Sequence, residues 1–186
     1  MKLLTTAIMA FAVIATPIEK EKKSVNTSQS TILWKGYKVT GSHQGTIAIK
    51  SGVLEFDNET LVGGSFVMDM PSITVTDLEG EYKGKLEGHL KSDDFFGVEK
   101  HTTSTLTFTD VKSVGKNAYE ITADLTVKSI THPVTFKLSV YGSQATASLK
   151  IDRTKYNIRY GSSSFFDDLK DKAIYDEFDI VADLQF

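Results

Sequence analysis

Strict alternation of apolar and polar residues is the feature that most limits how this chain can fold. In the run "YEITADLTVK", residues 119–128, every second residue is apolar, and the C-terminal run "EFDIVADLQF", residues 177–186, repeats the pattern. Successive side chains of a β-strand point to opposite faces, so each run predicts a strand with one buried and one solvent-exposed face. Similar runs recur after residue 30, and about eight strands can be counted.

Turn signals separate these runs. They are Asp57-Asn58, Gly115-Lys116-Asn117, His132-Pro133 and Gly142-Ser143. Short strands joined by tight turns predict an antiparallel meander, and a long meander with a single apolar face buries that face best by curling into a barrel. We therefore predict an all-β domain over residues 31–186, an eight-stranded antiparallel up-and-down barrel with one or two short helices.

The segment "TDLEGEYKGKLEGHL", residues 76–90, departs from the period of two. Its apolar residues recur every four positions, which is one face of a helix: Leu78, Tyr82, Leu86 and Leu90. Thr76 and Glu79 have the spacing of a capping box. Three glycines on the other side would cost such a helix about 3 kcal/mol. We expect it to form because its leucine face docks on the barrel, with a loose glycine-rich loop as the alternative.

The N-terminus resembles a secretory signal peptide. Lys2 precedes an apolar run of about thirteen residues, residues 3–15, whereas crossing a bilayer takes about 20. We expect a signal peptide over residues 1–15, with an uncleaved anchor as the alternative, and an unstructured polar tether over residues 16–30. The chain has no cysteine. The predicted location is periplasmic or secreted, with no stable membrane insertion after cleavage.

The charge of the chain argues against nucleic acid as a partner. Its formal net charge is −3, and residues of opposite sign are interleaved. Without a basic patch, no surface can neutralise a phosphate backbone.

Sequence motifs for catalysis and cofactor binding are missing. The segment "GSHQG", residues 41–45, has histidine where a nucleophile elbow needs serine, and neither a P-loop nor a dinucleotide fingerprint occurs. The histidines never form a close pair of metal ligands; they are His43, His89, His101 and His132. We predict no catalytic residue, no metal site and no cofactor.

Two segments combine paired aspartates with paired phenylalanines in opposite order. They are "HLKSDDFFGVEKH", residues 89–101, and "SSSFFDDLKDK", residues 162–172. We expect the phenylalanines of both to point into the barrel, while the aspartates cap turns and face water. The alternative is a cavity-based enzyme acting on a lipid, with His89, Asp93 or Asp94 as acid or base.

Four longer blocks together resemble the YceI family of periplasmic polyisoprenoid-binding proteins. They are "HLKSDDFFGVEKHTTSTLTFTDV", "YEITADLTVKSITHPVTF", "KIDRTKYNIRYG" and "AIYDEFDIVADLQF". The resemblance covers residues 30–186, although Ser129 stands where the family commonly has glycine. It implies a lipocalin-like eight-stranded barrel whose interior holds an extended apolar lipid, such as a polyprenyl chain or a fatty amide, and it implies no catalysis.

The predicted interior mixes large side chains with alanines, which leaves room for one slender ligand. The predicted lipid-contacting residues are Trp34, Phe66, Met68, Leu86, Leu90, Phe95, Phe96, Phe108, Leu125, Phe136, Leu138, Phe165, Phe166 and Phe178. His43 and Arg153 are candidates for a head-group contact, although Arg153 could instead pair with Asp152 or Asp167. A homodimer and a module that binds a protein partner stay open.

Overall fold

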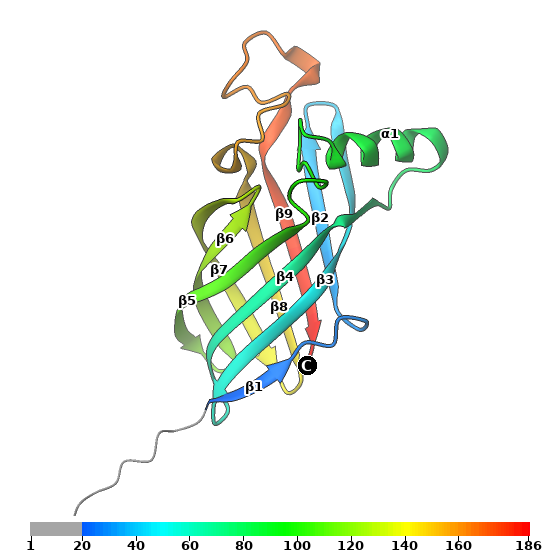
Figure 1. The fold of residues 1–186 in the computed structure, drawn as a ribbon. Helices are drawn as coiled ribbons and strands as arrows, with labels where there is room; N and C mark the ends of the chain where they lie inside the picture. The colour runs from blue at the N-terminus through cyan, green and yellow to red at the C-terminus, as the bar shows by residue number, and fades with distance from the viewer. Residues whose placement is uncertain (1–19) are drawn as a thin grey trace, which may run out of the picture.

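Eight antiparallel strands close into one barrel in the computed structural model, which describes residues 20–186 (Figure 1). The strands are β2 (Thr31–Lys38), β3 (Gly41–Asp57), β4 (Thr60–Val75), β5 (Thr103–Gly115), β6 (Ala118–Val127), β7 (Ile130–Tyr141), β8 (Gln144–Asp152) and β9 (Ile174–Gln185). Each pairs with the next along the chain, and β9 pairs with β2 to close the circle. The predicted up-and-down meander is confirmed.

An additional strand, β1 (Glu21–Ser24), lies outside the eight-stranded barrel. It pairs with residues 53–56 of β3, on the same side of β3 where β2 pairs with residues 41–47. Val25 follows it into the apolar core, with 8% of its surface exposed. The prediction of an unstructured tether is therefore wrong for this part of residues 16–30. Alternation gave no signal, because all four residues of β1 are polar and their backbone hydrogen bonds form the strand.

The predicted signal peptide, residues 1–15, lies outside the described residues. Among the residues that are described, no helix has the length and apolar character needed to span a bilayer.

The turn between β6 and β7 falls earlier than predicted. Lys128 and Ser129 connect the strands with φ angles of 50° and 63°, and a two-residue type I′ hairpin requires positive φ at both positions. Pro133, predicted to lie in the turn, instead belongs to β7 and faces Asp124 of β6. Lysine and serine rarely adopt positive φ, so these two residues do not mark the turn by themselves.

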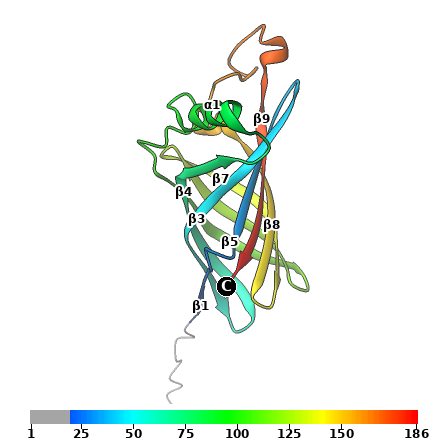
Figure 2. The same ribbon diagram turned by 90° about the vertical axis from the view of Figure 1, so that its right-hand side faces the viewer.

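Helix α1 (Gly80–Lys91) packs across one end of the barrel (Figures 1 and 2). Leu90 is buried, Leu86 packs against the same cluster, and Tyr82 is 74% exposed, so only part of the predicted apolar face docks. The capping box is wrong: the N-cap Glu79 makes no side-chain cap hydrogen bond. The backbone N–H of Thr76 instead bonds to the Gln44 carbonyl of β3. Thr76 therefore belongs to the end of the β3–β4 pairing and does not cap the helix, which begins at Gly80.

The connection from β8 to β9 is long and projects beyond the same end as α1 (Figures 1 and 2). It contains two short 3₁₀ helices, η1 (Arg153–Tyr156) and η2 (Lys170–Lys172). The C-terminus and β1 lie at the opposite end of the barrel (Figure 1).

The apolar interior divides into two clusters along the barrel. The cluster nearer β1 includes Leu54, Phe56, Leu138 and Leu184, and the rings of Phe56 and Phe186 stack there with their centres 5.7 Å apart. The cluster nearer α1 is formed by Trp34, Met70, Ile73, Val75, Leu90, Phe95, Phe96, Val98, Leu125, Val127, Ile151, Tyr156 and Ile158. Large side chains therefore line the barrel from one end to the other.

Candidate functional site

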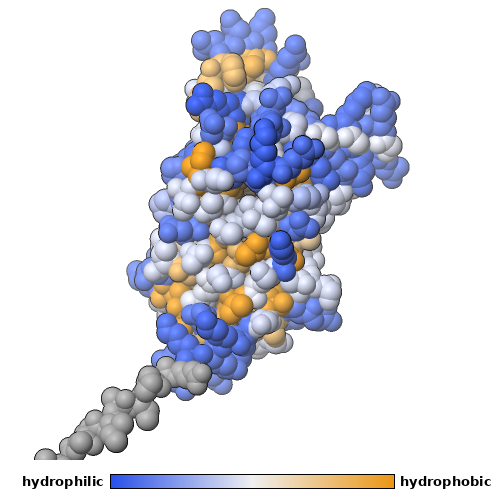
Figure 3. All heavy atoms as spheres, in the orientation of Figure 1, coloured by the Kyte–Doolittle hydropathy of each residue, from blue (hydrophilic) through white to orange (hydrophobic). Residues whose placement is uncertain are grey.

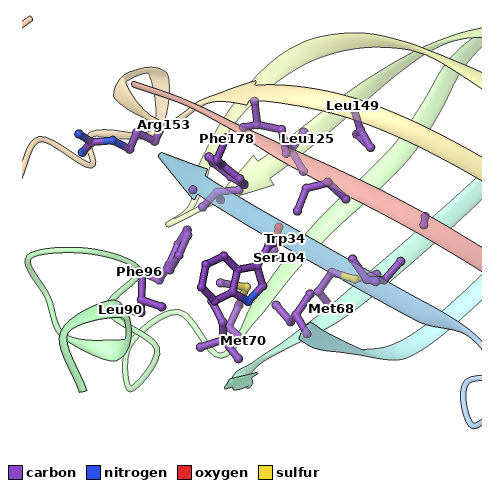
Figure 4. Close-up of a pocket in the computed structure, with 18 of the residues that line it drawn as sticks. Trp34, Met68, Met70, Leu90, Phe96, Ser104, Leu125, Leu149, Arg153 and Phe178 are labelled. Atoms are coloured by element: carbon purple, nitrogen blue, oxygen red, sulfur yellow. The ribbon is translucent and has the colours of Figure 1, made fainter. Parts of the chain in front are cut away.

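The interior of the barrel contains a cavity of about 360 Å³. It extends from Leu86 and Leu90 of α1 to Leu138 and Leu184 in the cluster nearer β1. Figure 4 shows the side chains of Trp34 and Phe96 among those that surround it. The volume falls within the range of about 300–1,000 Å³ that small-molecule sites occupy. Because its walls are mainly aliphatic and aromatic, the cavity suits an apolar ligand.

Most of the predicted contact residues lie on this cavity. They are Trp34, Phe66, Met68, Leu86, Leu90, Phe95, Phe96, Phe108, Leu125, Phe136, Leu138 and Phe178. Their contact with a lipid stays a prediction. Sequence analysis missed other lining residues, among them Ile32, Ile47, Met70, Ile73, Ile151 and Ile180. For Ile180 a signal was present, since it shares the period-two face of Phe178.

The prediction for the second phenylalanine pair is wrong. Phe165 and Phe166 are 42% and 50% exposed and do not line the cavity. They lie on the projecting connection, where Figure 3 shows apolar surface near the tip. The guanidinium of Arg159 lies 4.8 Å from the Phe165 ring centre, which gives this ring a partner outside the barrel. The neighbouring Asp167 and Asp168 are exposed, as expected.

The orientation of Trp34 in the cavity wall depends on a glycine. Gly45 of β3 faces Trp34 of β2 across the ladder. A Cβ at position 45 would lie 2.7 Å from the indole ring and 1.8 Å from the Thr74 carbonyl oxygen. The missing side chain lets the indole Nε1–H donate to that carbonyl, at 3.2 Å. Trp34 is therefore held in one orientation along the cavity wall.

Arg153 is a structural residue at the base of the projecting connection. It is 2% exposed and donates to four backbone carbonyls, those of Ile158, Tyr160, Ile174 and Tyr175, at 2.9 to 3.1 Å. Burial lowers the pKa of its guanidinium, and the carboxylate of Asp176, 3.5 Å away, acts in the opposite direction. The pairing with Asp152 or Asp167 is not found; Asp152 instead accepts from the Thr154 N–H at 2.9 Å.

His43, the other head-group candidate, lines the cavity near the start of β3. Its Nδ1 lies 3.0 Å from a carboxylate oxygen of Asp77, whose second oxygen accepts from the Gln44 N–H. Burial would raise the pKa of Asp77, but these hydrogen bonds outweigh it and lower the pKa. The imidazole of His43 is thus tied to the segment before α1.

The proposed acid and base residues are not brought together. Asp93 and Asp94 are exposed outside the cavity, and Asp93 pairs with Lys100, which lowers the pKa of the Asp93 carboxyl. Neither lines the cavity, whereas His89 does. Phe95 and Phe96, next in the chain, are buried on the cavity wall as predicted. Within residues 20–186, no cluster of histidine and carboxylate side chains could hold a metal ion.

The family is decided by the extent of the sequence match. The model of the YceI-like domain matches residues 24–186, which is nearly all of the described chain. This chain belongs to the YceI-like domain family. The match starts within β1, so the YceI-like domain includes part of the segment predicted to be a tether.

Among curated proteins, this YceI-like chain is similar to short stretches of bacterial relatives. A UPF0312 protein of Ectopseudomonas mendocina is 43% identical over 54 residues, and one of Azotobacter vinelandii is 44% identical over 46 residues. These stretches cover 29% and 25% of this chain, and 28% and 24% of the relatives. The matched stretch thus spans about a quarter of the relatives' length.

Solved structures share the fold at low sequence identity. BcnA of Burkholderia cenocepacia has a TM-score of 0.69 and 20% identity, over 86% of this chain and 98% of its own. A polyisoprenoid binding domain of Saccharophagus degradans has a TM-score of 0.63 and 14% identity, over 89% and 97%. A YceI protein of Campylobacter jejuni has a TM-score of 0.58 and 15% identity, over 100% and 98%. All three support the barrel.

Proposed function

We propose that this chain binds an extended apolar lipid, of the polyisoprenoid or fatty amide type, inside the barrel and carries or sequesters it. The observation that carries the proposal is the apolar cavity of about 360 Å³ lined by the strands and α1. Membership of the YceI-like family supports a binding role, and the similar domain of Saccharophagus degradans is described as polyisoprenoid binding.

The hydrophobic effect can supply the affinity. Removing one methylene from water contributes about 0.8 kcal/mol, so a five-carbon isoprene unit contributes several kcal/mol before the cost of ordering the chain. The walls of the cavity are flexible aliphatic side chains and aromatic rings, which fit many hydrocarbon shapes. Selectivity for chain length would then follow from the size of the cavity.

The proposed protein is periplasmic or secreted, and it binds its ligand without catalysing a reaction on it. The apolar run of residues 3–15 supports a periplasmic or secreted protein. Catalysis by His89 with Asp93 or Asp94 loses support, because both aspartates are exposed while the histidine faces the cavity. A homodimer stays a prediction.

Filling the cavity tests the proposal. Ala147 of β8 is 8% exposed and lines the cavity, so Ala147→Phe should weaken binding of the fluorescent apolar probe 1-N-phenylnaphthylamine at least about tenfold. Ser148, the next residue, is exposed, and Ser148→Phe adds the same ring outside the barrel. Its affinity should stay within about twofold of wild type. Equal affinity of wild type and Ala147→Phe, or no binding by lipid-free wild type, would contradict a cavity-bound lipid.

A further inference from the structure

Most polar side chains on the cavity wall already have partners within the protein. Ser104 donates to the Thr126 carbonyl at 2.7 Å, and the Tyr37 hydroxyl donates to Asp179 at 2.6 Å. The indole of Trp34 is bonded to a backbone carbonyl, as described above. These groups position wall residues and leave little capacity to bind a ligand.

The two residues predicted as head-group contacts are engaged as well. The guanidinium of Arg153 has four backbone carbonyls and a nearby carboxylate around it. The Nδ1 of His43 is held by Asp77. These hydrogen bonds serve the loops at this end of the barrel, and the Nε2 of His43, which has no partner among residues 20–186, is not buried as that of His89 is.

His89 differs from these groups. Its ring, on α1, packs edge-to-face against two aromatic neighbours, with ring centres 5.4 Å from Phe95 and 4.3 Å from Tyr160. Its Nε2 is fully buried and has no hydrogen-bond partner among residues 20–186. The residue also lines the cavity. A buried polar atom without a partner costs about 1–3 kcal/mol. Because Nε2 has almost no accessible surface, on the cavity side included, a turn of the ring toward the cavity would let a polar atom of a bound molecule relieve this cost.

We propose that Nε2 of His89 forms a hydrogen bond with an uncharged polar head group, a hydroxyl or a primary amide, of the lipid in the cavity. This rests on the proposed function and adds the class of head group. A neutral imidazole nitrogen either donates or accepts, and hydroxyl and amide groups can do both. Such a head group therefore fits either tautomer of His89.

A charged phosphate head group fits the site less well. Buried phosphate oxygens need cations, and the lysine and arginine residues that line the cavity are Lys38 and Arg153. Lys38 is exposed at the end of β2, and Arg153 is engaged with backbone carbonyls. Around His89, the rings of Phe95 and Tyr160 carry no charge. The Arg153 guanidinium, 5.6 Å from the centre of the Phe95 ring, already donates to the Tyr160 carbonyl.

The position of His89 also orients the ligand. Because α1 lies at one end of the barrel, a head group on His89 directs the hydrocarbon chain along the cavity toward Leu138 and Leu184. The stacked rings of Phe56 and Phe186 lie at that end. The lipid would then lie with its polar end beneath the helix.

The test compares ligands that share a hydrocarbon chain and differ in the polar end. Farnesol, β-farnesene and farnesyl diphosphate displace the fluorescent probe from lipid-free wild type, His89→Phe and His89→Gln. His89→Phe keeps an aromatic ring and removes the nitrogen, so its dissociation constant for farnesol should rise about five- to tenfold. The dissociation constant of His89→Phe for β-farnesene should stay within about twofold of the wild-type value. His89→Gln, which can still donate or accept, should recover most of the farnesol affinity.

A second histidine provides the control. His101 bonds to the Ser129 hydroxyl and does not line the cavity, so His101→Phe should leave all three ligands unchanged. Equal losses for farnesol and β-farnesene in His89→Phe, no loss for either, or a wild-type preference for farnesyl diphosphate over farnesol would overturn the proposal. If none of the three ligands binds the wild type, the proposed function fails with it.

Discussion

The two phenylalanine–aspartate segments contain the same pairs of residues but differ in the burial of their phenylalanines. Phe95 and Phe96 are 7% and 9% exposed and line the cavity, whereas Phe165 and Phe166 are 42% and 50% exposed on the projecting connection. Both segments lie at the same end of the barrel (Figures 1 and 2). The local sequence therefore does not decide burial; the way each segment is attached to the barrel does.

The first segment is held against the barrel along its backbone. The Phe96 N–H bonds to the Leu90 carbonyl of α1, and the Lys128 ammonium donates to the carbonyls of Asp93 and Phe95. Burial lowers the pKa of Lys128. With the backbone held in this way, the side chains of Phe95 and Phe96 point into the barrel and line the cavity.

The second segment is fastened at its base, by Arg153 and by the hydrogen bond from the Ser164 hydroxyl to Asp176 of β9. Arg153 bonds to carbonyls of Ile158 and Tyr160 on one side and of Ile174 and Tyr175 on the other. Between them, Asp168 and Lys170 adopt positive φ angles of 58° and 51°, which turn the chain back on itself beyond the barrel.

Removing Arg153 should give the largest effect. Arg153→Met leaves four backbone carbonyls without their donor and removes the charge beside Asp176. Breaking such a buried charged group costs about 3–5 kcal/mol. Urea unfolding of lipid-free protein measures this loss, and hydrogen exchange should become faster in residues 157–173. Arg159 is exposed, so Arg159→Met should change the free energy of unfolding by less than about 0.5 kcal/mol. Equal stability of the two variants would show that Arg153 does not hold the connection.

Truncating one ring from each segment tests the contrast directly. Phe96→Ala removes a buried ring and should lower the free energy of unfolding by about 3 kcal/mol. Phe166→Ala removes a half-exposed ring and should lower it by less than about 1 kcal/mol. Urea unfolding curves of the lipid-free variants give both values. Similar losses would mean that Phe166 packs in solution as Phe96 does.

Acid should loosen the attachment of the first segment by a smaller amount. Glu87 of α1 accepts from the Thr74 hydroxyl at 2.5 Å and the Val75 N–H at 2.9 Å, and these bonds, chiefly that from Thr74, lower the pKa of its carboxyl from 4.5. Because the folded pKa lies below the unfolded one, this stabilisation is present above pH 4.5 and disappears as pH falls through the folded pKa.

The matched variants are Glu87→Gln and Asp167→Asn. Glu87→Gln should be about 1 kcal/mol less stable than wild type at pH 7, because it loses the charge on the acceptor. The deficit should shrink below pH 4.5. Asp167 is exposed, so Asp167→Asn should follow the wild type throughout. Unfolding curves between pH 3 and 7 measure both, and a Glu87→Gln deficit that persists at pH 3 would contradict the linkage.

The sequence predicts the barrel well because alternation is a local signal. Tyr119, Ile121 and Ala123 are buried in order along β6, as a half-buried strand requires. Strand β1, with four polar residues, is formed by pairing with β3 and has no such signal. The turn at Lys128 and Ser129 was missed because strand pairing fixes its position despite unfavourable residues.

The site is harder to predict than the barrel. Strand residues such as Phe66 and Phe136 follow from alternation, and both line the cavity. Loop residues depend on contacts between distant segments. By sequence Arg153 is a head-group candidate, whereas in the structure it donates to backbone carbonyls as distant in sequence as that of Tyr175. The unpartnered nitrogen of His89 likewise depends on the packing of Phe95 and Tyr160 around α1.

The central claim is that the cavity holds an apolar lipid, and native mass spectrometry of protein purified from its own host tests it most directly. Organic extraction and mass analysis then identify what was bound. The account predicts a bound apolar molecule that the solvent releases, with a hydroxyl or amide at one end, and its loss from Ala147→Phe but not from Ser148→Phe. A wild-type spectrum that shows only the mass of the bare chain, with no apolar molecule in the extract, would contradict it.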